Sequence, residues 1–127
     1  MPRRYLTPSE MESAIARGKS VECFLGACEK GAQKGIKWLL AFRDGEGVCL
    51  KVFETADYGD KDFIDLYEFG PLNSALEQDE PDEEEMFESF NSLISEVEVK
   101  FPGSSTRFVN EGVVQDEYSD FIDRGRK

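Results

Sequence analysis

Apolar and polar residues alternate most regularly between Ile36 and Thr55. In the first half of this stretch every second residue is apolar, and the pattern resumes after a glycine-containing turn. The alternating residues are Ile36, Trp38, Leu40 and Phe42, and then Val48, Leu50 and Val52. A period of two places each set on one face of a β-strand. The pattern therefore predicts a β-hairpin.

The length of the turn sets which residues of the two strands face each other. A two-residue turn at Asp44-Gly45 would place Lys51 among the apolar side chains. A three-residue loop, residues 45–47, would instead place Leu40 opposite Val52, and it suits the Asp and Gly preferences of a type I turn. We therefore expect the three-residue loop. The other face of the hairpin, with Leu39 and Ala41 beside charged residues, is expected to be only partly covered.

Helix and strand signals flank the hairpin. Thr7-Pro8-Ser9-Glu10 combines a capping box with proline at the first helical position, and Gly18 supplies a stop. Alternation predicts a strand over Ser20–Cys28 and a fourth strand over Asp62–Phe69. These elements predict a β-meander over residues 20–69.

The remainder of the chain begins with an acidic loop, residues 73–81, and then shows a helical period. Asp82 and the glutamates after it suit a helix start, and apolar residues recur at three- and four-residue spacings up to Val97. We expect helices at residues 82–97 and 112–124. Thr106–Asn110 would add a short strand. The element order predicts one α+β domain with an antiparallel four-stranded sheet, five-stranded with that addition, and helices packed mainly on one face.

Composition narrows the possible functions. The 127 residues fit one domain, and ten Phe, four Tyr and one Trp supply a core. A net charge of −12 disfavours nucleic acid and anionic membranes as ligands. No apolar run approaches the ~20 residues of a spanning helix, and the N-terminus lacks the apolar segment of a signal peptide. Three cysteines do not form a disulfide framework, so we expect a cytoplasmic protein.

The usual catalytic and metal-binding patterns are missing. The sequence has no histidine, which removes the common Ser-His and Cys-His nucleophile pairs. In the acidic turn that begins at Asp57 and includes Asp65, Gly59 precedes Asp60 and is not at the centre of a calcium loop, and the twelfth residue, Glu68, lies inside the predicted strand. The Gly31–Lys37 loop is glycine- and lysine-rich, but Ala32 stands where a P-loop requires lysine. We expect no enzyme, cofactor or metal, although 27 acids leave a catalytic carboxylate pair as an alternative.

Charge is distributed unevenly along the chain. Residues 1–55 carry nine basic and seven acidic side chains, whereas residues 56–127 carry six and twenty. We therefore expect a non-catalytic protein-binding module, an inhibitor or adaptor, that docks on a basic partner such as a toxin, a nuclease or a nucleic-acid-binding protein. The candidate partner-binding residues are Glu83, Glu84, Glu85, Glu88, Asp116, Glu117, Asp120 and Asp123.

Two other functions fit the sequence. The Gly31–Lys37 loop and a pocket over the sheet would suit a small-molecule or anion binder. The second, half-apolar face of the hairpin would suit a self-assembling structural subunit.

Overall fold

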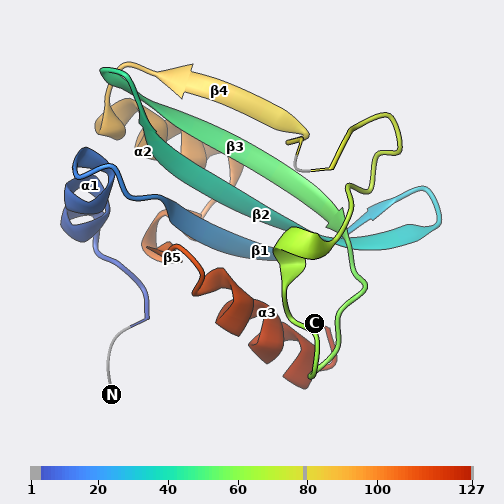
Figure 1. Ribbon diagram of the computed structural model, residues 1–127. Helices are drawn as coiled ribbons and strands as arrows, with labels where there is room; N and C mark the ends of the chain where they lie inside the picture. The colour runs from blue at the N-terminus through green and yellow to red at the C-terminus, as the bar shows by residue number, and fades with distance from the viewer. Residues whose placement is uncertain (1–3, 79, 127) are drawn as a thin grey trace.

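The computed structural model describes residues 4–78 and 80–126 and shows a five-stranded antiparallel sheet with three α-helices (Figure 1). The predicted α+β class is confirmed. The strands lie in the order β4-β3-β2-β1-β5. Along the chain the elements are α1 (Pro8–Ala16), β1 (Val21–Lys30), β2 (Gln33–Asp44), β3 (Gly47–Ala56), the 3₁₀ helix η1 (Leu66–Glu68), β4 (Glu83–Phe87), α2 (Phe90–Lys100), the 3₁₀ helix η2 (Ser104–Thr106), β5 (Val109–Asn110) and α3 (Val114–Asp123).

The first helix forms as its capping signals predict. The Thr7 hydroxyl accepts a hydrogen bond from the Glu10 backbone N–H, and the Glu10 carboxylate accepts one from the Thr7 N–H. Gly18, just after the helix, has a φ of 84°, a left-handed conformation that glycine adopts without strain. Local sequence therefore fixes both ends of α1.

The central hairpin exists, but its predicted three-residue loop is wrong. Asp44 pairs with Gly47, so only Gly45-Glu46 connects the strands, with φ of 62° at Gly45. Glycine at the first of two turn residues is typical of a II′ turn. Relative to the prediction every pair is shifted by one residue, so that Val52 lies opposite Leu39, and Leu40 lies opposite Lys51.

The structural reason for this shift in strand pairing is that helices cover both faces of the sheet. On one face α1 and α2 enclose a core that includes Met11, Leu39, Leu50, Leu93 and Phe108. On the other, η1 and α3 enclose Phe24, Ile36, Trp38, Tyr118 and Phe121. Two of the three helices thus lie on one face as predicted, and α3 lies on the other (Figure 1).

Because both faces are covered, the prediction that one face of the hairpin is only partly covered is wrong. Leu39 and Ala41, assigned above to a half-covered face, are completely buried. The structure therefore removes the open apolar face on which self-assembly was to depend.

The predicted fourth strand, Asp62–Phe69, is also wrong. This segment holds η1, and its Leu66 and Phe69 are buried against the second core. The fourth strand is β4, which pairs with β3 and lies within the predicted helix 82–97. Ser89 caps α2 instead, since its hydroxyl accepts a hydrogen bond from the Ser92 N–H. Glu83–Glu85 therefore belong to an edge strand, where exposed charged side chains are common.

The remaining differences concern the lengths of elements. β1 and β2 extend further than predicted, and only Gly31-Ala32 links them in place of the expected loop. The predicted strand Thr106–Asn110 is present as the two residues of β5 beside β1. The predicted helix 112–124 is confirmed as α3.

Candidate functional site

The predicted partner-binding acids do not form one surface. Glu83, Glu84 and Glu85 are exposed on β4 at one edge of the sheet, and Glu88 is exposed just after it. The other four lie on α3, which packs against β1 towards the opposite edge (Figure 1). The structure therefore separates the two groups that the sequence assigned to one docking surface.

Most of the α3 acids make contacts within the protein. Glu117 is 5% exposed, and its carboxylate accepts hydrogen bonds from Arg4 (2.6 Å) and from the Tyr5 hydroxyl (2.8 Å). Arg4 also pairs with Asp120 (2.6 Å), and Asp123 pairs with Lys61 (3.3 Å). Glu117 thus joins the N-terminal segment to α3, and of the four α3 acids only Asp116 is both exposed and without a salt bridge among the described residues.

The lysines of the Gly31–Lys37 segment do not line a pocket over the α3 face. Lys37 lies on the α2 face, where its ammonium pairs with Glu54 (3.5 Å) and sits 5.4 Å from the centre of the Phe101 ring. Lys30 and Lys34 are exposed on either side of the Gly31-Ala32 turn. Lys30 and Lys37 instead border a separate cavity together with Glu54, Asp82 and Glu83, whose carboxylates disfavour an anion there.

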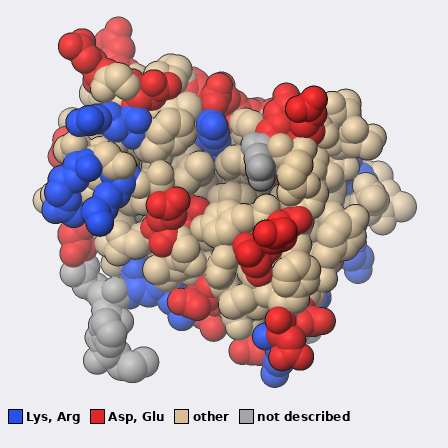
Figure 2. Space-filling view, in the orientation of Figure 1, with Lys and Arg blue, Asp and Glu red and all other residues tan. Residues whose placement is uncertain are grey.

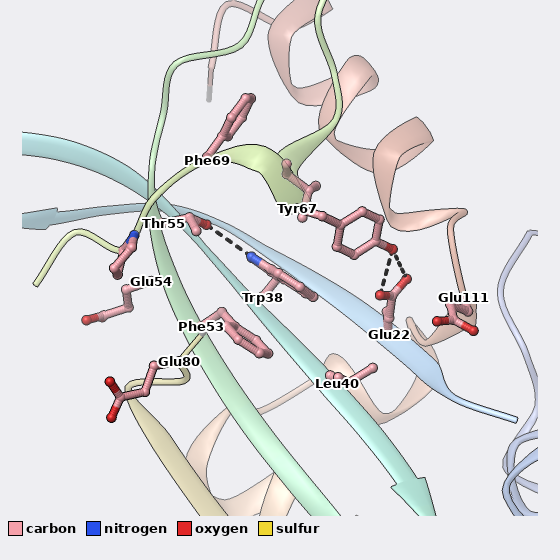
Figure 3. Close-up of a pocket in the computed structure, with 12 residues that line it drawn as sticks. Glu22, Trp38, Leu40, Phe53, Glu54, Thr55, Tyr67, Phe69, Glu80 and Glu111 are labelled. Atoms are coloured by element: carbon pink, nitrogen blue, oxygen red, sulfur yellow. Dashed lines mark hydrogen bonds between the residues drawn. The ribbon is translucent and has the colours of Figure 1, made fainter. Parts of the chain in front are cut away.

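A pocket of about 200 Å³ does open over the sheet, between β1–β3 and the η1 segment (Figure 3). Its apolar surface is largely aromatic. Trp38 and Phe53, which face each other across β2 and β3, are stacked with ring centroids 4.4 Å apart. Tyr67 from η1 stands nearly perpendicular to Trp38, at 78° and 5.5 Å, and Phe69 follows it. Strand pairing and η1 together bring these rings to one place.

The polar atoms of the aromatic walls are already hydrogen-bonded. The Trp38 indole N–H donates to the Thr55 hydroxyl (3.0 Å). The Tyr67 hydroxyl lies 2.7 Å from each carboxylate oxygen of Glu22, and the Gly112 N–H donates to the same carboxylate (2.9 Å). Glu22 is only 1% exposed, and this burial raises its pKa above the ordinary value. Burial and the neighbouring Glu22 likewise raise the pKa of Tyr67.

The electrostatic character of the pocket is acidic. Glu22 and Glu111 lie at one end and Glu80 at the other (Figure 3). Glu54 also borders the pocket, but its carboxylate pairs with Lys37 on the far face. Of the described residues that line the pocket, none is lysine or arginine.

The surroundings of the pocket have the same character. Lys51 lies on this face opposite Leu40 but is held by Glu84 (3.6 Å) and by the Phe42 ring. Figure 2 shows acidic side chains spread across this face, whereas the largest basic group lies towards the end that holds α1. The charge of the pocket and of the surrounding face is therefore complementary to a cation.

Sequence reasoning missed Glu22, Tyr67, Glu80 and Glu111 as site residues. One signal was present, because Glu22 interrupts the apolar run Val21–Phe24, and a charged residue there indicates a buried polar contact. The other acids resemble the many solvated carboxylates around them. Only the fold shows that they line one pocket.

The predicted acidic turn has a structural role within the protein. Asp57 pairs with Arg126 (2.8 Å) and accepts a hydrogen bond from Tyr118. Over residues 4–78 and 80–126 there is no group of three or more His, Cys, Asp or Glu side chains arranged to hold a metal ion. Within the same ranges, the helices are too short or too polar to cross a membrane.

Comparison with protein-family models, with curated proteins and with solved structures finds no match to this chain.

Proposed function

We propose that this protein is a non-catalytic module that docks on a basic protein and takes one cationic side chain of that partner into the Trp38 pocket. The observation that carries the proposal is the composition of the pocket, which is aromatic and acidic with no lysine or arginine among the described lining residues. A cation over an aromatic face gains roughly 0.5–2 kcal/mol, and Trp is the best such ring. The partner would be a toxin, nuclease or nucleic-acid-binding protein, with this chain as inhibitor or adaptor.

The size of the pocket supports one side chain as the ligand. Its volume of about 200 Å³ is smaller than the ~300–1,000 Å³ of pockets that hold drug-sized molecules. A nucleotide or a similar cofactor exceeds it. The net charge of −12 would speed the encounter with a basic partner, because complementary fields raise association rates more than they raise affinity.

Titration of the Trp38 fluorescence tests this proposal, because Trp38 is the single tryptophan and lines the pocket. A lysine- and arginine-rich peptide should change the emission and bind, whereas the same peptide with glutamine at the basic positions should not. Replacing both Glu80 and Glu111 by glutamine should weaken binding about fivefold, since each exposed charge pair is worth roughly 0.2–1 kcal/mol. The effect should shrink at high salt.

A matched control is the double replacement of Glu83 and Glu85 by glutamine. This variant removes the same amount of charge, but from the β4 edge. Residues 83 and 85 pair with Val52 and Leu50, whose side chains lie on the α2 face of the sheet, so the lost charges are on the face opposite the pocket. Binding should stay within twofold of the unmodified protein. If this control weakens binding more than the pocket variant does, docking runs through the β4 edge, as the sequence alone predicted, and the pocket proposal is wrong.

A further inference from the structure

We propose that Glu22 is the residue of the Trp38 pocket that holds the cationic side chain of the partner, so that the charge state of Glu22 controls docking. This inference rests on the proposed function and specifies which acid of the pocket binds the cation and how pH regulates it. It follows from the lack of a basic partner for Glu22 in the described chain, from its place in the pocket and from its remaining acceptor positions.

Glu22 differs from two other carboxylates that are largely shielded from water. Glu117 is 5% exposed and pairs with Arg4 (2.6 Å), and the Asp57 side chain is 8% exposed and pairs with Arg126 (2.8 Å). Glu22 is only 1% exposed, yet it has no salt bridge with any described residue. A carboxylate that leaves water without a cation nearby is costly. A lysine or arginine of the partner would supply to Glu22 what Arg4 supplies to Glu117.

The place of Glu22 in the sheet brings it to the pocket. It lies opposite Leu40 of β2, so both side chains are on the pocket face of the sheet, and both line the pocket (Figure 3). Glu80 and Glu111 line the same pocket but are exposed to solvent. Attraction between opposite charges is stronger where water is excluded. Glu22 should therefore contribute more to cation binding than either exposed acid.

The Glu22 carboxylate can still accept a hydrogen bond. An ionised carboxylate offers about four acceptor positions. Two donors reach it, the Tyr67 hydroxyl at 2.7 Å from both oxygens and the Gly112 N–H at 2.9 Å. Even with the hydroxyl shared between the two oxygens, one position remains. An N–H of an ammonium or a guanidinium can occupy that position without displacing Tyr67.

The surroundings of Glu22 also make its charge sensitive to pH. Burial raises its pKa, the hydrogen bonds from Tyr67 and Gly112 lower it, and the neighbouring Glu111 raises it. Tyr67 on η1 and Glu111 after β5 are the titratable groups that face it in the described chain, and β2 contributes the uncharged Leu40. A bound cation favours the ionised carboxylate, so cation binding and ionisation of Glu22 strengthen each other. Affinity should therefore rise with pH through the raised pKa of Glu22 and level off above it.

The test measures the affinity of the full chain for the lysine- and arginine-rich peptide, by calorimetry and by Trp38 fluorescence, from about pH 5 to about pH 8. The peptide keeps its charge over this range, and the chain has no histidine that would titrate within it. Glu22→Gln should weaken binding about tenfold at neutral pH, more than the double replacement of Glu80 and Glu111, because it removes a charged hydrogen-bond acceptor from a buried position. The same variant should abolish most of the rise in affinity with pH.

Two controls match Glu22→Gln. Glu83→Gln removes one charge from the opposite face of the sheet and should leave affinity within twofold. Asp82→Asn removes a second carboxylate whose pKa is raised by burial, but Asp82 borders a separate cavity, so the pH profile of binding should not change. If Asp82→Asn flattens that profile and Glu22→Gln does not, the inference is wrong.

Tyr67→Phe gives a readout that a merely structural role of Glu22 would not move. The hydrogen bond from the Tyr67 hydroxyl lowers the pKa of Glu22, so its removal should shift the rise in affinity to higher pH. Tyr58→Phe makes the same change at a side chain that is 67% exposed and should leave the profile in place. A profile that stays in place or moves to lower pH in Tyr67→Phe overturns the inference. This comparison needs no Glu22 variant, so it holds even where Glu22→Gln does not fold.

The outcomes separate this inference from the proposed function. If the basic peptide binds but Glu22→Gln changes its affinity less than twofold and leaves the pH profile intact, the exposed acids hold the cation. The inference then fails and the proposed function stands. If the basic peptide does not bind, or its glutamine counterpart binds equally well, the proposed function fails and this inference fails with it.

Discussion

The sharpest stability prediction concerns the buried hydroxyl of Tyr118. Tyr118 lies on α3, and its side chain is completely buried against the segment that follows β3. Its hydroxyl accepts a hydrogen bond from the Gly59 N–H (2.9 Å) and donates one to the Asp57 carboxylate. Burial raises the pKa of Tyr118 to about 12, so the hydroxyl keeps its proton at neutral pH. Tyr118→Phe removes both contacts and leaves the ring in place.

The two contacts contribute unequally to the expected loss. The Gly59 N–H is left without a partner in a buried position, which costs about 1–3 kcal/mol. Asp57 keeps its ion pair with Arg126, so the loss there is smaller. We expect Tyr118→Phe to lower the free energy of unfolding by about 2–3 kcal/mol, a large part of the ~5–15 kcal/mol typical of a domain.

Urea unfolding at neutral pH and 25 °C, followed by circular dichroism, measures this loss. The midpoint should fall while the dependence on urea concentration stays the same. The control is Tyr58→Phe, the same chemical change at a side chain that is 67% exposed, and it should lower stability by less than about 0.5 kcal/mol. A loss below that limit for Tyr118→Phe would refute the reasoning, because a buried N–H would then lack a partner at no cost.

Three further predictions use the same unfolding assay. Leu39→Ala should cost about 2–5 kcal/mol and Leu40→Ala clearly less, because Leu39 is completely buried and Leu40 half-buried; equal losses would contradict the observed register. Thr7→Ala should cost about 1 kcal/mol through loss of the α1 cap, and an unchanged midpoint would mean that the capping box contributes nothing. Glu22 has a raised pKa in the folded protein, so its own contribution to stability should fall as pH rises from about 4.5 through that pKa. The measure is the stability of the unmodified protein minus that of Glu22→Gln, which should fall over this range, and a difference that grows with pH would show the sign to be wrong.

Features that depend on neighbouring residues were determined by the sequence alone. The capping box at Thr7 and Glu10 places α1, because its donors and acceptors lie within one helical turn. Alternation between Ile36 and Thr55 gives the central hairpin, and the spacing in residues 112–124 gives α3. The α+β class follows from that order of elements.

Features that depend on distant residues were decided by the tertiary structure. The hairpin register depends on coverage of both sheet faces, which the alternation within one strand does not reveal. Glu83–Glu85 resemble the acidic first turn of a helix, yet pairing with β3 makes them an edge strand. Asp62–Phe69 alternates like a strand, yet Leu66 and Phe69 pack from a loop.

The pocket shows the same division most clearly. Glu22, Trp38 and Tyr67 come from β1, β2 and η1, and Glu111 comes from the segment that follows β5. Apart from Glu22, which interrupts an apolar run, each is an ordinary residue in its own stretch of sequence. Their chemistry depends on contacts between residues that are up to 90 positions apart, as between Gly112 and Glu22. Such contacts form only when the sheet is assembled and its second face is covered, because burial then forces each polar atom to find a partner.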